Sequence, residues 1–228
     1  MDKNNFVKYV DLLTIKKVNE ETTKEEFVFL PRENDIVIGK YVEKCNMLQY
    51  GENVPIRKSV YNKLLNAAKK LQSINKNYVL LVVYGYRAME MQVQYFNEIY
   101  EDVKDKFDDK VELYEYIHEK IAVPEVAGHP TGGAVDIEIY DVESKKAINF
   151  GAEILDWDTT KCYYENDSLT EEERNNRRFL RELMMSEGFA PYDGEWWHFS
   201  YGDKEWAFYY KKEEALYNQI DSKNVYNN

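Results

Sequence analysis

Two short segments place strong constraints on how this chain can fold. The first, at 128–136, contains His129 and Asp136, and the second contains Glu195 and His198. The chain has only three histidines, and two of them lie in these segments, each together with a carboxylate. Imidazole nitrogens and carboxylate oxygens are zinc ligands, and a catalytic site keeps a fourth position for water. The fold is therefore expected to bring these segments together around one catalytic zinc ion.

The local pattern around each of these residues is compatible with such a site. His129 lies in a loop rich in glycine, and Asp136 lies in an alternating segment, 134–140, on the side opposite the apolar residues. Residues three apart in a strand face opposite sides. Glu195 and His198 can therefore share one centre only if Glu195 lies at the edge of a loop. The preceding Asp-Gly turn permits this, and Glu195 is then a candidate general base for water that zinc activates.

The rest of the chain indicates an α+β fold with a central, mostly antiparallel sheet flanked by helices. Helices and strands are mixed without the regular alternation of a parallel α/β protein. A capping-box pattern begins at Thr170, and Gly188 lies where a helix end is expected. The expected strands are 26–30, 36–41, 78–84, 134–140 and 196–201, and the expected helices are 58–71, 87–100, 111–121 (the weakest) and 170–187.

Composition narrows the range of functions and partners. The net charge is −12, which argues against nucleic-acid binding, because phosphate contacts require clustered Lys and Arg. No run of residues is long and apolar enough for a membrane span, and the N-terminus lacks the apolar core of a signal peptide. We therefore expect a cytoplasmic protein. Cys45 and Cys162 suit a reducing compartment, although the sequence leaves open whether they pair. A single domain over residues 1–228 is expected, with its core at 58–206 and a polar tail at 211–228.

The third histidine, His118, is expected on the surface of a helix, in a structural or solvated role. The glycines near His129 do not form a phosphate-binding loop, because the Gly-Lys-Ser/Thr ending is missing. No serine lies in a G-x-S-x-G nucleophile segment.

Taken together, the motifs resemble those of zinc D-alanyl-D-alanine peptidases. The segment 127–136 resembles the S-x-H-x-x-G-x-A-x-D motif of these enzymes, and the segment 195–198, Glu-Trp-Trp-His, resembles their E-x-W-H motif. The segment 84–87, Tyr-Gly-Tyr-Arg, is similar to the D-G-Y-R segment of the D-Ala-D-Ala dipeptidase (VanX-like) branch. The order and spacing of the motifs match over residues 58–206.

This resemblance implies a zinc D,D-peptidase (hedgehog-like) fold, with one catalytic zinc ion and a small D,D-dipeptide such as D-Ala-D-Ala as substrate. It makes His129, Asp136 and His198 the zinc ligands and Glu195 the catalytic base. It makes Arg87 the residue that steadies the oxyanion, a role suited to a fixed guanidinium in a site poor in water.

The chain departs from the family pattern at three places. Ala127 replaces the leading serine, and Tyr84 replaces the aspartate of the D-G-Y-R segment. The acid that helps to hold the substrate ammonium is displaced by one residue, so Asp156, or alternatively Glu153, is expected to take that role.

Two alternative functions stay open on the sequence. One is a D,D- or L,D-carboxypeptidase or endopeptidase that acts on cell-wall peptides. The other is a non-catalytic zinc-binding domain, against which the presence of Glu195 argues, because a structural site needs no base. The sequence does not decide the oligomeric state or the biological purpose.

Overall fold

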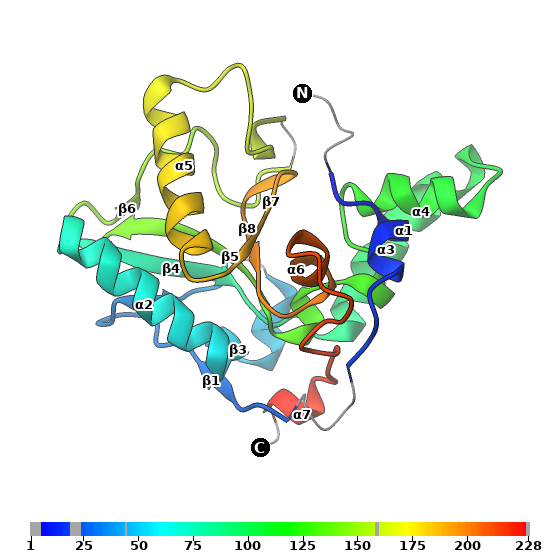
Figure 1. Ribbon diagram of the computed structural model, residues 1–228, viewed down its shortest axis with the longest axis horizontal. Helices are drawn as coiled ribbons and strands as arrows, with labels where there is room; N and C mark the ends of the chain where they lie inside the picture. Colours follow the sequence, from blue (N-terminus) through cyan, green and yellow to red (C-terminus); the bar gives the residue numbers. More distant parts are fainter. Residues whose placement is uncertain (1–5, 19–23, 44, 158–159, 227–228) are drawn as a thin grey trace.

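A central sheet with helices on both sides organises the chain (Figure 1). The computed structural model describes residues 6–18, 24–43, 45–157 and 160–226. Its strands are β1 (Phe27–Phe29), β2 (Val37–Gly39), β3 (Pro55–Arg57), β4 (Tyr78–Tyr84), β5 (Ala134–Asp141), β6 (Lys146–Ala147), β7 (Ala190–Tyr192) and β8 (Glu195–Ser200). Its α-helices are α1 (Tyr9–Leu13), α2 (Lys58–Ile74), α3 (Met89–Val103), α4 (Lys110–His118), α5 (Glu171–Met185), α6 (Lys204–Tyr209) and α7 (Lys223–Tyr226).

The main sheet is mostly antiparallel, as the sequence predicts. Its strands run in the order β2-β4-β5-β8-β7, with β6 paired to β5. Among the described strands of this sheet, only β2 and β4 pair in parallel, and β1 and β3 form a separate antiparallel pair. The α+β prediction is therefore confirmed.

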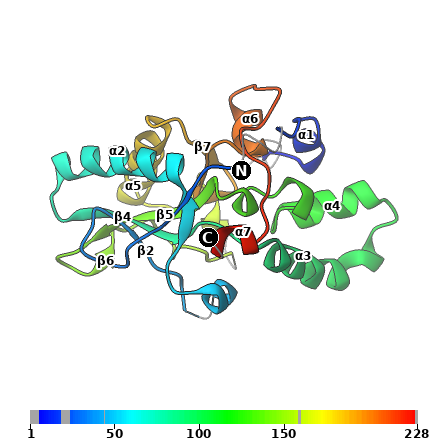
Figure 2. The same cartoon turned by 90° about the horizontal axis from the view of Figure 1, so that it is seen from below.

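Helices α2 and α5 cover one face of the sheet and form the main core with it (Figures 1 and 2). In β5, Val135, Ile137 and Ile139 point into this core and are fully buried, as their alternation predicts. The expected capping box at the start of α5 is present: Thr170 accepts from the Glu173 backbone N–H, and the Glu173 carboxylate accepts from that of Thr170. Burial of one large aliphatic side chain contributes about 1.5–3 kcal/mol. This core is the largest apolar cluster among the described residues, so it contributes the most to stability.

Helices α1, α3 and α4 form a second group on the side of the molecule away from α2 (Figures 1 and 2). They share their own apolar cluster, which includes Leu12, Phe96, Leu113 and Ile117. Asp136 of β5 lies on the opposite face of its strand from the main core, so the cleft between this group and the sheet receives polar side chains.

Several local expectations differ from the structure. His118 is only 9% exposed, so its expected place on a helix surface is wrong. It ends α4, and its Nδ1 accepts a hydrogen bond from the backbone N–H of Val123. The segment after Tyr210, which reads as polar, packs against the body through buried Tyr217 and Val225. The short elements α1, β3 and α6 have too few residues for a periodic signal.

The two cysteines are both buried and free, which answers the question that the sequence left open. Among the described residues, no helix has the length and apolar character needed to cross a membrane.

Candidate active site

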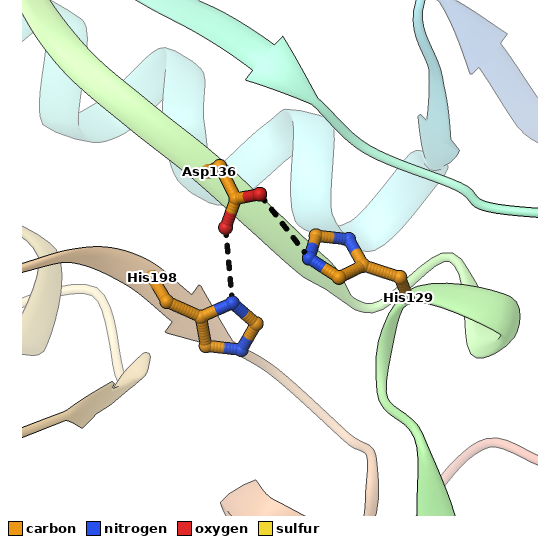
Figure 3. Close-up of side chains that lie close together, drawn as sticks. All are labelled: His129, Asp136 and His198. Atoms are coloured by element: carbon orange, nitrogen blue, oxygen red, sulfur yellow. Dashed lines mark hydrogen bonds and ion pairs between the residues drawn. The ribbon is translucent and has the colours of Figure 1, made fainter. Parts of the chain in front are cut away.

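Neighbouring strands place two of the three expected metal ligands side by side. Asp136 of β5 and His198 of β8 are direct partners in the antiparallel register, so their side chains project from the same face. His129 approaches from the short 3₁₀ turn η6 (His129–Thr131), just before β5. Gly132 ends that turn with φ of 74°, a left-handed conformation that favours glycine. Figure 3 shows the three side chains facing one another.

The distances in this cluster suit a shared metal ion. Asp136 Oδ1 lies 3.0 Å from His198 Nδ1, and Asp136 Oδ2 lies 3.4 Å from His129 Nε2. One ligand atom from each residue lies within 4.8 Å of the others, and all three residues are buried. In the part of the chain that the structure describes, this is the one group of three such residues close enough to hold a metal. Two imidazole nitrogens and a carboxylate oxygen are a donor set that fits zinc.

Hydrogen bonds fix which nitrogen of His129 faces the cluster. Its Nδ1 lies 2.7 Å from the backbone oxygen of Gly85, so Nδ1 carries the proton and Nε2 presents a lone pair to Asp136. Glycine is required at position 85 by its packing against β3, because a Cβ there would lie 2.6 Å from the backbone oxygen of Pro55. Burial lowers the pKa of His129, which keeps the imidazole neutral and able to bind a metal.

His198 is held between two carboxylates. Its Nδ1 faces Asp136, and its Nε2 lies 3.5 Å from Glu205 Oε2, at the start of α6. Burial opposes a charge on this ring, but Glu205 and Asp136 together raise the pKa of His198 well above its ordinary value. Burial alone would raise the pKa of Asp136, but the two imidazoles hold that pKa below its ordinary value. Asp136 is therefore ionised, as a metal ligand must be.

Glu195 lies next to the cluster, at the first position of β8 after the Asp-Gly turn. Its Oε2 lies 3.9 Å from His198 Nδ1, and its side chain is 19% exposed. Trp157 donates an indole N–H to Oε1 at 2.9 Å, and Trp197 donates one to Oε2 at 3.1 Å. Burial raises the pKa of Glu195 to about 7, and the charge of Asp136 adds to the shift. A carboxylate with such a pKa can accept and release a proton near neutrality.

Arg87 follows β4 and points its buried guanidinium toward the same cavity. Its Nη1 donates to Gln92 Oε1 at 2.9 Å, and Gln92 in turn donates to the backbone oxygen of Ala122 at 2.7 Å. The guanidinium also lies over the ring of Tyr84, 4.5 Å from its centroid. Arg87 is thus a fixed positive charge in the wall of the site.

A cavity of about 430 Å³ connects these groups. Its wall includes the polar or aromatic residues Glu43, Tyr84, Arg87, Gln92, Tyr95, Glu98, His118, Lys120, His129, Asp136, Trp157, Tyr192, Glu195, His198 and Glu205. Asp156 and Glu153 do not line it, although Leu155 and Trp157 do. The structure therefore brings His129, Asp136, His198, Glu195 and Arg87 together, but leaves Asp156 outside the wall.

Sequence reasoning missed three polar residues of this site, namely Trp157, Gln92 and Glu205. Gln92 lies in the first turn of α3, five residues after Arg87, which itself precedes the helix, so no helical spacing marks their contact. Trp157 and Glu205 lie in segments with no motif, so no local signal marks them.

A family model described as D-Ala-D-Ala dipeptidase, of the peptidase M15 group, matches residues 38–219. The chain belongs to the D-Ala-D-Ala dipeptidase family. It is 26% identical over 189 residues to a D-alanyl-D-alanine dipeptidase of Synechocystis, covering 72% of this chain and 76% of that protein. It is 27% identical over 144 residues to the D-alanyl-D-alanine dipeptidase of Enterococcus faecium, covering 60% and 68%.

Solved structures give more distant matches to this member of the dipeptidase family. A zinc-bound VanY D,D-pentapeptidase is 17% identical, with 89% of this chain and 96% of that chain covered and a TM-score of 0.40. The LdcB LD-carboxypeptidase is 16% identical, with 88% and 92% covered and a TM-score of 0.47. Family membership makes the chain a peptidase, as the sequence motifs predict.

Proposed function

We propose that this enzyme is a zinc dipeptidase that hydrolyses D-alanyl-D-alanine, or a closely related D,D-dipeptide, to free amino acids. The observation that carries the proposal is the buried His129–Asp136–His198 cluster with Glu195 beside it, on the wall of one cavity. Membership of the D-Ala-D-Ala dipeptidase family supports this choice of substrate.

We assign zinc to His129 through Nε2, to Asp136 through its carboxylate and to His198 through Nδ1, because these atoms face one another. When bound, zinc acts as a Lewis acid that polarises the scissile carbonyl and makes water more acidic. The hydrogen bond from His129 to Gly85 and the contact of His198 with Glu205 orient the two imidazoles for this task.

We assign proton transfer to Glu195. Its carboxylate takes a proton from the water that attacks the scissile carbonyl and gives a proton to the leaving amino group as the C–N bond breaks. Each dipeptide and one water molecule then yield two amino acids. The raised pKa of Glu195, about 7, suits a group that must both accept and release a proton.

We assign Arg87 to stabilisation of the negative charge that develops on the carbonyl oxygen. Its guanidinium is buried and is held by Gln92, so it needs little reorganisation during the reaction. Contact of Asp156 with the substrate ammonium stays a prediction. In the sequence, Asp156 lies between Leu155 and Trp157, which both line the cavity.

The chain is further proposed to act as one domain and in the cytoplasm. The main core takes residues from Leu30 to Val225, which supports one domain that extends beyond the expected core at 58–206. The two free, buried cysteines agree with a reducing compartment.

The decisive experiment is incubation of the purified, zinc-loaded protein with D-Ala-D-Ala, followed by measurement of free D-alanine. Release is expected from the wild type and is expected to disappear in Glu195→Ala at equal zinc content. Release from a pentapeptide ending in D-Ala-D-Ala, with none from the free dipeptide, would instead identify a D,D-carboxypeptidase. A zinc-loaded protein that is inactive on both would contradict the proposal.

A further inference from the structure

The carboxylate of Glu195 is held by two indole N–H groups, one on each oxygen. Trp197, which donates to Oε2, lies within the Glu-Trp-Trp-His segment itself, two residues from Glu195. Trp157, which donates to Oε1 at 2.9 Å, comes from the connection between β6 and α5 and belongs to none of the motifs. One half of the support for the candidate base thus comes from a distant part of the chain.

The segment that carries Trp157 is anchored to α5 on both sides of that residue. The buried guanidinium of Arg177 donates to the backbone oxygens of Phe150 at 2.7 Å, Lys161 at 2.8 Å and Tyr163 at 2.6 Å. Arg177 therefore fixes the backbone at positions before and after Trp157. This restricts the position from which the indole of Trp157 reaches Glu195.

The ring of Trp157 is itself part of the cavity wall. It is 50% exposed, although it packs edge-on against the ring of Trp197, with centroids 5.8 Å apart. A large aromatic side chain that is half exposed contributes little to the core. Its placement is better explained by the hydrogen bond to Glu195 and by the wall that it forms beside that carboxylate.

We propose that Trp157 is a positioning residue for the reaction, whose indole N–H holds the Glu195 carboxylate in the orientation that faces the His129–Asp136–His198 cluster. The inference rests on the proposed function, in which Glu195 is the base. If the indole N–H of Trp157 is removed, only Trp197 still donates to Glu195. Oε1 of Glu195 then loses its hydrogen bond, and the carboxylate gains freedom to turn toward water in the cavity. A base out of line with its proton slows the chemical step far more than it weakens substrate binding.

The first test observes the contact without using activity. The chain has four tryptophans, so a protein labelled with ¹⁵N gives a small set of indole N–H resonances, and Trp157→Phe identifies that of Trp157. Glu195→Gln is expected to shift the resonances of Trp157 and Trp197. The resonance of Trp206, whose indole donates to the backbone oxygen of Gly188 at 3.0 Å, is expected to stay in place. If the Trp157 resonance does not respond to Glu195→Gln, the proposal is wrong.

The second test measures steady-state kinetics on D-Ala-D-Ala. Trp157→Phe keeps an aromatic ring and removes the N–H, and its exposed site makes misfolding a minor concern. We expect kcat to fall about tenfold to a hundredfold, as for loss of a hydrogen bond to a charged group, with KM within about threefold and zinc content unchanged. The matched control is Tyr209→Phe, which likewise keeps the ring and removes one hydrogen-bond donor, because Tyr209 is 40% exposed and lies outside the wall of the cavity. Its kcat is expected to stay within about twofold of wild type.

The two tests separate the possible failures. A Trp157→Phe enzyme with kcat within about twofold of wild type would overturn the positioning role even if the resonance responds. A wild-type protein that releases no D-alanine would refute the proposed function, and the indole resonance alone would then decide whether Trp157 holds Glu195.

Discussion

Substitution of Arg177 by alanine tests the view that one buried side chain anchors the segment next to the active site. Arg177 lies on α5 and is 1% exposed. Burial lowers its pKa to about 10, so the guanidinium is still charged at neutral pH. Its three short hydrogen bonds to the backbone oxygens of Phe150, Lys161 and Tyr163 all disappear in Arg177→Ala.

The expected cost follows from those bonds. A hydrogen bond to a charged group contributes about 1.5–3 kcal/mol, so three of them set an upper range of about 4.5–9 kcal/mol. The loss is smaller in practice, because the segment opens and water reaches part of the freed carbonyl groups. We expect the free energy of unfolding to fall by about 3–5 kcal/mol, which corresponds to a fall in melting temperature of roughly 6–20 °C for a chain of this size.

The assay is equilibrium urea denaturation of the metal-free protein, so that zinc binding does not contribute to the measured stability. Arg178→Ala is the matched control, because Arg178 is the next residue of the same helix and is exposed. That variant is expected to stay within about 0.5 kcal/mol of wild type. A loss below about 1 kcal/mol in Arg177→Ala, equal to that of the control, would refute the anchoring argument.

Two further predictions concern pH and metal. Burial, together with the nearby Glu153, raises the pKa of Glu138 from its ordinary value of 4.5 to about 7, so the folded state favours the protonated carboxyl. The stability of the folded state that depends on the protonated Glu138 is complete below pH 4.5 and is lost as the pH rises through 7. Glu138→Gln cannot ionise, so its free energy of unfolding is expected to exceed that of wild type by up to about 3 kcal/mol at pH 8 and by much less at pH 5. Denaturation curves at the two pH values measure both differences. Equal gains at the two pH values would contradict this account. Zinc is expected to raise the melting temperature of the wild type and chelation to lower it, whereas His198→Ala, which lacks one proposed ligand, is expected to show little response to either. A His198→Ala protein with the full zinc-dependent shift would remove His198 from the ligand set.

Much of the fold was predictable because its signals are local. The alternation of apolar residues in β5 defines a buried face with Val135 and an opposite face with Asp136. The capping box at Thr170 marks the start of α5, since both of its hydrogen bonds lie within four residues. The clustering of His129, Asp136 and His198 was also expected, because the two motifs carry zinc-ligand side chains that can bind one metal ion only if they lie close together.

Other features could not be predicted from local pattern. His118 ends a weakly amphipathic helix, and its burial depends on the packing of α4 against α1 and on the backbone N–H of Val123. Asp156 was chosen by its position in a motif, but the path of the connection after β6 presents Trp157 to the cavity instead. A shift of one residue along an irregular segment changes which side chain points inward, and no periodicity records that choice.

The sequence alone determined the chemistry that is available: two histidines, an aspartate, a glutamate and an arginine in recognisable segments, on an α+β framework. Periodicity, capping and motif spacing are properties of neighbouring residues, so they can be read without the fold. Only the tertiary structure decided how these groups are supported. Gly85 orients His129, Glu205 faces His198, Gln92 holds Arg87 and Trp157 holds Glu195. Two of these contacts, those of His129 and Glu195, join segments far apart in the chain, and the geometry of all four depends on how loops and helices pack.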